Sequence, residues 1–281
     1  MTDCRIEHIT ADSEYYAALR ELWCDTFDDE PAYVDAVYSK LQAEGYAVAD
    51  TAESGSSAAG RKLLSAVTVY EAGSLDGTAV DVLYAVCTRI DKRGLGYASR
   101  LVEHCWHKAH DSERLMLAFP VEPSLTDYYL NLGIDLICSA ENIETEAEGI
   151  PINFENISAS VYNEYRESFF RISGMKHIAL SEQFAKFIGC EYRLVLINNG
   201  DAIAAVDISD PQKSGAEDSA RLLIPELIVN PRLLERSGNI DETIAGALAA
   251  EYGKVSAVYR TVGSGDTSAD GEKLYFGFPL D

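Results

Sequence analysis

The fold of this chain is decided by the stretch VDVLYAVCTRIDKRGLGY, residues 80–97. A short apolar run, Val82 to Cys87, leads to the basic pair Lys92-Arg93 and then to Gly94-Leu95-Gly96. Apolar residues next recur at threes and fours through residues 97–110, which is the spacing of one helix face. The pattern therefore predicts a strand, a glycine turn and a helix.

A helix that begins at a glycine turn leaves its first backbone N–H groups without intrahelical partners. These donors, with the positive end of the helix dipole, form a binding site for phosphate. Glycine at positions 94 and 96 lets the backbone approach an anion because no Cβ intervenes. A Gly-x-Gly pair alone is equally compatible with a plain strand-to-helix turn that binds nothing.

A second informative segment, YYLNLGI at residues 128–134, lies one strand and one helix further along the chain. It places Tyr129 four residues before Gly133. A phenol suits acyl transfer from a thioester because the departing thiolate needs a proton or a donated hydrogen bond. The alternative is that Tyr129 is an aromatic packing residue of an amphipathic helix.

The two segments together resemble the GNAT superfamily of acetyl-CoA-dependent acyltransferases. Its signature, Arg/Gln-x-x-Gly-x-Gly/Ala, matches both glycines of the window 91–96 but meets Asp91 at its first position. The family's Phe-Tyr-x-x-x-Gly-Phe segment corresponds to residues 128–134. Where many members have an Asn before the tyrosine, this chain has Glu122 and then Pro123, which resembles the "enhanced intracellular survival" branch of aminoglycoside acetyltransferases.

The resemblance implies an α/β fold with a mixed sheet, acetyl-CoA as the acyl donor, and no metal. The implied reaction is direct attack on the thioester by a primary amine of a small, cationic acceptor, with Tyr129 protonating the leaving sulfur. The main-chain N–H near Val86 would stabilise the oxyanion. The donor-binding residues that the resemblance implies are Val86, Cys87, Thr88, Lys92, Arg93, Gly94, Leu95, Gly96 and Tyr97.

The group that removes the proton from the amine stays open at the level of sequence. The candidate carboxylates are Asp81, Glu122, Glu21, Asp25 and Asp281. Cys87 lacks a partnered base in the sequence, so a covalent acyl-enzyme is not expected. Two rivals remain, namely an acyl-CoA-binding sensor without turnover and a structural α/β protein whose glycine turn is empty.

The composition limits the class of protein and its partners. A formal net charge of −23 opposes binding to nucleic acid or to an anionic membrane. No apolar run reaches the length of a membrane span, and the N-terminus lacks a signal-peptide pattern. The 6 cysteines are scattered, as in a reduced protein. We therefore expect a cytoplasmic protein.

The chain is long enough for two domains, and its second half repeats the first. An acidic, turn-rich segment at 140–156 indicates a linker or a domain boundary, and polar loops are expected at 53–60, 210–220 and 263–273. The order of helices, hairpin, strand, helix and strand then recurs with an offset of roughly 140 residues. The expected helices are 162–170, 181–188 and 240–252, and the expected strands are 193–197, 202–208, 222–229 and 254–262.

The repeat lacks both chemical segments. No Gly-x-Gly follows the strand 222–229, and no Tyr-x-x-x-Gly segment follows residue 262. We therefore expect a catalytic GNAT domain at 1–145 and a degenerate GNAT-like domain at 146–281. The second domain would shape the acceptor cleft or form the contact of a homodimer.

Overall fold

The computed structural model describes residues 5–50, 62–120, 122–138, 141–208, 220–236, 238–261 and 274–278. The chain divides into two compact units, Met1–Ile137 and Cys138–Asp281. This division comes earlier than the expected boundary after residue 145. The expected loops at 53–60, 210–220 and 263–273 lie outside the described residues, apart from Ala220, as does Asp281.

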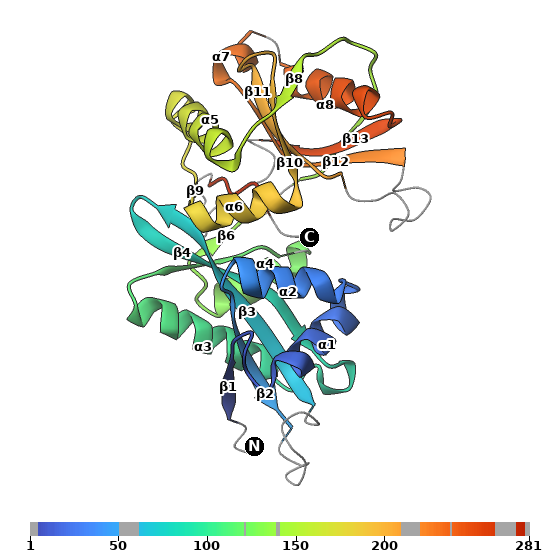
Figure 1. Ribbon diagram of the computed structural model, residues 1–281. Helices are drawn as coiled ribbons and strands as arrows, with labels where there is room; N and C mark the ends of the chain where they lie inside the picture. Colours follow the sequence, from blue (N-terminus) through green and yellow to red (C-terminus); the bar gives the residue numbers. More distant parts are fainter. Residues whose placement is uncertain are drawn as a thin grey trace. The chain divides into compact units, whose positions relative to one another are not determined.

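The first unit alternates strands and helices in the order that the sequence predicts (Figure 1). Its elements are β1 (Ile6–Ile9), α1 (Tyr16–Phe27), α2 (Pro31–Lys40), β2 (Glu44–Ala49), β3 (Leu63–Leu75), β4 (Thr78–Thr88), η3 (Ile90–Lys92), α3 (Tyr97–Asp111), β5 (Leu115–Ala118), η4 (Pro123–Leu125), α4 (Thr126–Asn131) and β6 (Leu136–Ile137). β3 and β4 are joined at Asp76-Gly77, where both residues have positive φ, as a tight hairpin turn requires.

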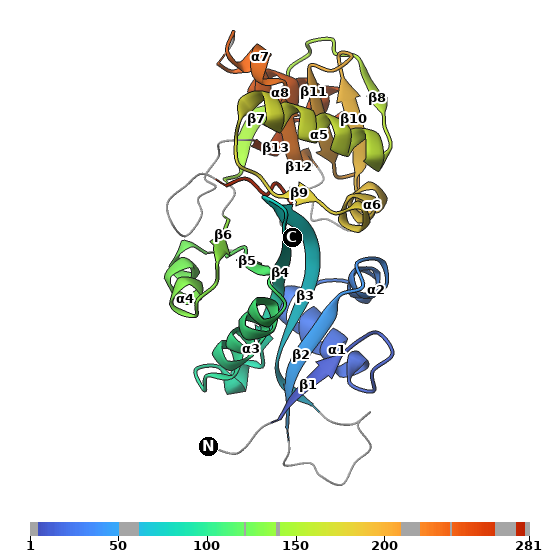
Figure 2. The ribbon, with the colours of Figure 1, turned by 90° about the vertical axis from the view of Figure 1, so that its left-hand side faces the viewer.

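The sheet of the first unit is mixed and runs in the order β1-β2-β3-β4-β5-β6. The pairs from β1 to β4 are antiparallel, whereas β4–β5 and β5–β6 are parallel. α3 covers one face of this sheet, and α1 and α2 cover the other (Figure 2). The α3 side buries Leu101, Val102 and Cys105 against strand residues such as Val67 and Leu83. Burial of this helix stripe explains the apolar spacing seen in the sequence.

The second unit has its own mixed sheet, in the order β7-β13-β12-β11-β10-β8. Its elements are β7 (Ile143–Glu146), β8 (Phe154–Asn156), α5 (Ala159–Ser173), β9 (Ala179–Leu180), α6 (Glu182–Glu191), β10 (Arg193–Ile197), β11 (Ala202–Val206), β12 (Arg221–Val229), α7 (Pro231–Leu234), α8 (Ile240–Glu251) and β13 (Ser256–Thr261). β12–β13 is parallel, like β4–β5 of the first unit. The predicted mixed α/β fold with a repeated second half is therefore confirmed.

Residues 140–156, predicted as a linker or a boundary, begin close to the division between the two units, but they are not a linker without regular structure. This segment contributes both edge strands of the second sheet, because β7 pairs with β13 and β8 pairs with β10. Both strands are short, with 4 and 3 residues, and carry several exposed acidic side chains. Short, charged strands are common at sheet edges because they resist pairing with other chains, and their composition imitates a loop.

The hairpin predicted at Asn198-Asn199-Gly200-Asp201 is present between β10 and β11. Asn198, Asn199 and Gly200 have φ values of 47°, 58° and 112°. The Ile197 carbonyl accepts hydrogen bonds from the amides of Gly200 and Asp201, at 3.0 and 2.9 Å. Asparagine and glycine tolerate positive φ better than other residues, which is why the sequence signal was reliable.

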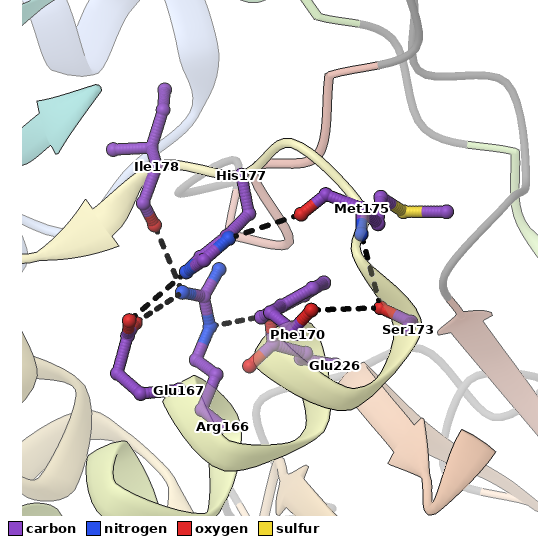
Figure 3. A network of polar contacts seen from close by, with 8 residues as sticks. All are labelled: Arg166, Glu167, Phe170, Ser173, Met175, His177, Ile178 and Glu226. Atoms are coloured by element: carbon purple, nitrogen blue, oxygen red, sulfur yellow. Dashed lines mark hydrogen bonds and ion pairs between the residues drawn. The ribbon is translucent and has the colours of Figure 1, made fainter. Parts of the chain in front are cut away.

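A buried ion pair joins α5 to β12 in the second unit (Figure 3). The side chains of Arg166 and Glu226 are both 0% exposed, and Arg166 Nε lies 3.2 Å from Glu226 Oε1. The Tyr162 hydroxyl donates to Glu226 Oε2 at 2.6 Å, and Arg166 Nη1 donates to the Ile178 carbonyl at 2.9 Å. The carboxylate is thus hydrogen-bonded at both oxygens, as a charge removed from water requires.

We predict that Glu226→Ala destabilises the second unit by about 3–5 kcal/mol, because it leaves the Arg166 charge buried without its carboxylate partner. Hydrogen–deuterium exchange of the peptides covering α5 and β12, followed across a denaturant series, measures this loss. Glu155→Ala, at an exposed carboxylate of β8, is the control. Equal losses in the two variants would contradict the stabilising role of the pair.

Candidate functional site

The strand β4 loses one neighbour before it ends. Its parallel pairing with β5 runs from Val80–Leu115 to Leu83–Ala118, and in the described residues no pair extends past Leu83. β4 itself continues to Thr88, still paired with β3. One edge of the backbone from residue 84 to 88 is therefore not covered by β5. Such an edge presents unpaired N–H and C=O groups.

A bulge re-aims the backbone at the start of this edge. Ala66 pairs with Cys87 and Thr68 pairs with Tyr84, so Ala85 and Val86 together oppose a single residue of β3. Ala85 has φ 47°, a conformation that a non-glycine residue rarely adopts. Bulges of this kind redirect backbone and side chains and recur next to functional sites.

The glycine turn that follows presents open backbone donors. Gly94 and Gly96 have φ values of 76° and 80°, and Gly96 caps α3 without any side-chain hydrogen bond. The first hydrogen bond of the helix runs from the Arg100 amide to the Gly96 carbonyl, at 3.1 Å. The amides of residues 94–99 make no hydrogen bond to another described residue. Residues 93–96 are exposed, so these donors are accessible to an anion.

Basic side chains surround the turn in an otherwise acidic protein. Between residues 89 and 100 there are four basic residues and one acidic residue, so the segment carries 4 − 1 = +3 against −23 for the whole chain. The carboxylate of Asp91 lies 3.2 Å from Arg89 Nε and 3.6 Å from Lys92 Nζ. Asp91 is therefore neutralised locally, and its replacement of the family's Arg or Gln leaves the turn positive.

Two further arginines complete this basic segment. Arg93 Nε donates to the Thr88 carbonyl at 3.3 Å, which ties the turn to the end of β4. Arg100 is exposed one helical turn after Gly96, and no ion pair joins it to another described residue. The sequence analysis did not single out Arg100, although its place in the first turn of the predicted helix was a usable signal.

Tyr129 lies on α4 and packs against the core beneath α3. Val86 and Tyr97 pack against the same buried cluster, so residues from β4, α3 and α4 meet there. Burial, and then the neighbouring Tyr128, raise the pKa of Tyr129 to about 12. The phenol therefore keeps its proton at neutral pH. No hydrogen bond joins its hydroxyl to another described residue.

The rest of the tyrosine segment positions α4. The Tyr128 hydroxyl lies 3.1 Å from Ser99 Oγ in the first turn of α3. Gly133 has φ 86°, and a Cβ there would lie 3.4 Å from the Trp106 ring of α3. The glycine of the motif thus allows α4 to end close against α3, a contact that a larger residue would disturb.

Cys87 and Thr88 contribute main-chain groups and packing. Cys87 is 2% exposed and its Sγ contacts the Ala66 carbonyl at 3.6 Å. Burial raises the pKa of the Cys87 thiol to about 12, so it is a poor nucleophile. Ser65 Oγ donates to the Cys87 carbonyl and lies 2.8 Å from Thr88 Oγ1. These bonds fix the end of β4 before the turn.

The carboxylates suggested as bases have different surroundings. Asp81 forms a bidentate pair with Arg114, with Nε–Oδ2 2.8 Å and Nη2–Oδ1 2.6 Å. These hydrogen bonds raise the pKa of Arg114, and the pair lies seven residues before the end of β4. This arrangement favours a structural role for Asp81. Glu122 is exposed, and its carboxylate accepts from Ser124 Oγ at 3.2 Å.

Glu21 and Asp25 lie together on the α1 side of the sheet. They line a small cavity of about 140 Å³ with Lys62 and Arg89. Arg89 follows the end of β4, and its amide donates to the Leu64 carbonyl at 3.0 Å. These two carboxylates are therefore at the same end of β4 as the glycine turn. A larger cavity, of about 530 Å³, lies on α5 and α6 of the second unit.

The glycine turn itself is not part of either cavity. Its open amides can still bind an anion, because an extended phosphate-bearing chain can lie along an exposed turn and needs no closed cavity there.

The second unit differs from the first in the segment that follows β12. After β12, the side chain of Asn230 caps α7 by accepting from the Arg232 amide at 3.1 Å. β12 also has an irregularity between Ile224 and Leu227, but its pairing with β13 resumes at Leu227–Thr261. The predicted loss of the glycine turn thus coincides with a strand that regains its pairing and with a short helix, α7, that a side chain caps. The longer helix α8 (Ile240–Glu251) begins after Asn239 without a side-chain cap.

Neither a metal site nor a membrane helix is found in the described part of the chain. Its histidines, cysteines and acidic residues form no group of three or more that could hold a metal ion. None of its helices is both long and apolar enough to cross a membrane.

No protein-family model matches this chain. No curated protein matches its sequence. Solved structures with a similar fold include a GCN5-related N-acetyltransferase from Anabaena variabilis ATCC 29413, with TM-score 0.60 and 12% identity over 91% of this chain and 66% of that one. A probable N-acyltransferase from Enterococcus faecalis V583 has TM-score 0.55 and 11% identity, covering 94% of this chain and 67% of that one.

A third solved structure has nearly the same extent as this chain. It is a tandem GNAT protein from the clavulanic acid biosynthesis pathway, with TM-score 0.55 and 12% identity over 91% of this chain and 90% of that one. Identities this low show the fold alone. The chain therefore has the fold of GCN5-related N-acetyltransferases, including the tandem arrangement, and spans about two thirds of the length of the two proteins above.

We predict that Tyr129 titrates near pH 12, about two units above an unperturbed tyrosine. Ultraviolet absorbance is followed against pH for the protein and for Tyr129→Phe. The difference between the two curves is the phenolate signal of Tyr129, and it should rise in that range. Because the folded-state pKa is raised, Tyr129 stabilises the fold fully below pH 10, and this contribution is lost as the pH rises from about 10 to 12. If the Tyr129 phenolate signal already appeared near pH 10, in protein still folded by circular dichroism, the burial argument would be contradicted.

Proposed function

We propose that this protein is an acetyl-CoA-dependent N-acyltransferase that moves an acetyl group to a primary amine of a small acceptor. Two neighbouring groups of unpaired backbone atoms carry the proposal. They are the edge of β4 that β5 does not cover and the open amides at the start of α3. The fold shared with GCN5-related N-acetyltransferases is consistent with it.

The donor would bind first through its pyrophosphate. Backbone N–H groups of residues 93–97 supply hydrogen bonds, and the dipole of the 15-residue helix α3 favours negative charge at this end. Lys92, Arg93 and Arg100 add positive charge around the same turn. The residues present thus fit a diphosphate, and the turn has neither a side-chain cap nor a burying element that would exclude it.

The acyl arm would lie along the free edge of β4. The backbone groups from Val86 to Thr88 would pair with the amide groups of the pantetheine arm, as an added strand pairs with a sheet edge. The bulge at Ala85 redirects the backbone of this stretch, which includes the main-chain N–H of Val86. We assign the stabilisation of the developing oxyanion to that N–H.

Tyr129 would assist the departure of the thiolate. Its pKa of about 12 exceeds that of an ordinary thiol, about 8.5, so complete proton transfer is uphill by about 5 kcal/mol. A buried phenol of this kind is better suited to donate a hydrogen bond to the sulfur as charge develops. Tyr129 therefore acts by stabilising the leaving group. The thiolate takes its proton from solvent or from the attacking nitrogen, which must lose a proton to become the neutral amide.

The acceptor must lose a proton before or during attack, since an amine with the pKa of lysine is about 99.9% protonated at neutral pH. Asp81 is occupied by Arg114, and we do not assign it to this step. Glu21 and Asp25 lie at the correct end of β4 and would attract a cationic amine. Glu122, which is exposed and stands where many GNAT members have an Asn, keeps the likeness to the intracellular-survival branch as part of the proposal.

We predict that acetyl-CoA raises the melting temperature of the protein and that Gly96→Ala abolishes this shift. Alanine has room at position 96 but is strained at φ 80°, so the turn and its amides must rearrange. Gly77→Ala is the matched control, because Gly77 has φ 86°, equal space, and lies in the β3–β4 turn. A full ligand shift in Gly96→Ala would contradict the proposed anion site.

We predict that Tyr129→Phe lowers kcat for thiol release by about 10²–10⁴-fold while leaving acetyl-CoA binding intact. A coupled thiol-release assay with a panel of primary amines measures this, with Tyr128→Phe as the control. Binding of acetyl-CoA without thiol release for any amine would instead favour the sensor without turnover. Unchanged kcat in Tyr129→Phe would remove Tyr129 from the reaction.

A further inference from the structure

A second cavity belongs to the second unit, none of whose residues takes part in the proposed acyl transfer. It has a volume of about 530 Å³ and lies along the helices α5 and α6. The two helices approach each other closely at one point, where a Cβ on Gly189 of α6 would lie 3.1 Å from the Ala159 side chain of α5. Ala159 and Ala185 also line the cavity. The volume falls within the range of small-molecule sites.

Successive turns of α5 contribute polar side chains to the lining of this cavity. Asn163, Glu164, Glu167 and Arg171 follow each other at helical spacing and all line it. The Oδ1 atom of Asn163 is buried and accepts no hydrogen bond from any described residue. A buried acceptor without a donor costs about 1–3 kcal/mol, which a ligand N–H group would recover.

The carboxylate of Glu167 lines the cavity and is held in place by His177 and Arg166 (Figure 3). Its Oε2 lies 3.0 Å from His177 Nε2, and its Oε1 lies 3.7 Å from Arg166 Nη1. Burial raises the pKa of Glu167, but the bond to His177 and the nearby Arg166 and Arg171 outweigh it, so the net pKa is lowered. This carboxylate therefore stays negative at neutral pH.

Acidic and basic side chains occupy different parts of the cavity lining. Glu182 and Lys186 of α6 neutralise each other, with Nζ–Oε1 2.5 Å. Glu164 and Arg171 are both exposed, and no ion pair joins either of them to another described residue. The cavity thus offers an acidic group beside Asn163 and, two turns later on α5, the basic group of Arg171, whose charge also acts on Glu167.

We propose that this cavity binds a small zwitterion of dipeptide size, with its ammonium group at Asn163 and Glu164 and its carboxylate at Arg171. Seven residues separate Glu164 from Arg171, which is about 10 Å along a helix. A dipeptide spans about 7 Å, and the two long side chains cover the remainder. A single α-amino acid is too short to reach both groups. The proposal is independent of the acyl-transfer function, because it uses residues of the second unit only.

Calorimetric titration of the full chain with alanylalanine, its N-acetyl derivative and its C-terminal amide tests the proposal. We expect saturable binding of the zwitterion and at least tenfold weaker binding of each blocked derivative. Absence of saturable binding of alanylalanine, or equal binding of all three compounds, would overturn it.

Variants locate the two charged groups. Glu164→Gln should weaken alanylalanine and its amide alike, by about tenfold, since both carry the ammonium group. Arg171→Gln should weaken alanylalanine by about tenfold and leave the amide unchanged. Glu155→Gln and Arg232→Gln, exposed residues of β8 and α7 away from the cavity lining, are the matched charge controls.

The same titration separates this site from the first unit. Glu21→Gln and Asp25→Asn should leave alanylalanine binding unchanged, because both residues line the cavity near β4. Binding that depends on Glu21 or Asp25 and not on Glu164 or Arg171 would overturn the second-unit site while supporting the acceptor site. Failure of acetyl-CoA to bind, with alanylalanine still bound, would overturn only the proposed function.

Discussion

The structure depends on the loss of β5 pairing beyond Leu83 in β4. Up to that residue both edges of β4 are hydrogen-bonded, and beyond it only β3 remains as a partner. The bulge at Ala85 and the glycine turn follow directly, so unpaired strand backbone and open helix amides come from one short stretch. Backbone polar groups must be satisfied by protein, water or ligand. This stretch leaves them to water or to a ligand.

The second unit shows what the same topology becomes when these groups are satisfied internally. There β12 resumes its pairing after an irregularity, and Glu226 at that irregularity is 0% exposed and bound by Arg166 and Tyr162. In the first unit, by contrast, Tyr84 of β4 contacts Trp23 of α1 edge-on at 5.2 Å, so an aromatic pair joins helix and strand there.

The sequence predicted those features that have a local cause. The apolar spacing of α3, the glycine turn at Gly94 and Gly96, and the Asn198–Asp201 hairpin all rest on preferences of single residues or of one helix face. It failed where the cause was distant. β7 and β8 were taken for a linker because their strand character comes from pairing with β13 and β10, residues far along the chain.

By itself, therefore, the sequence determined the strand–turn–helix unit, the repeat of the fold and the absence of a second glycine turn. Only the tertiary structure decided that Ala85 forms a bulge, that Asp81 is occupied by Arg114, and that Tyr129 meets Val86 and Tyr97 at one buried cluster. The reason is physical. The roles of Ala85, Asp81 and Tyr129 depend on which distant segments fold against them, and no local sequence pattern records those contacts.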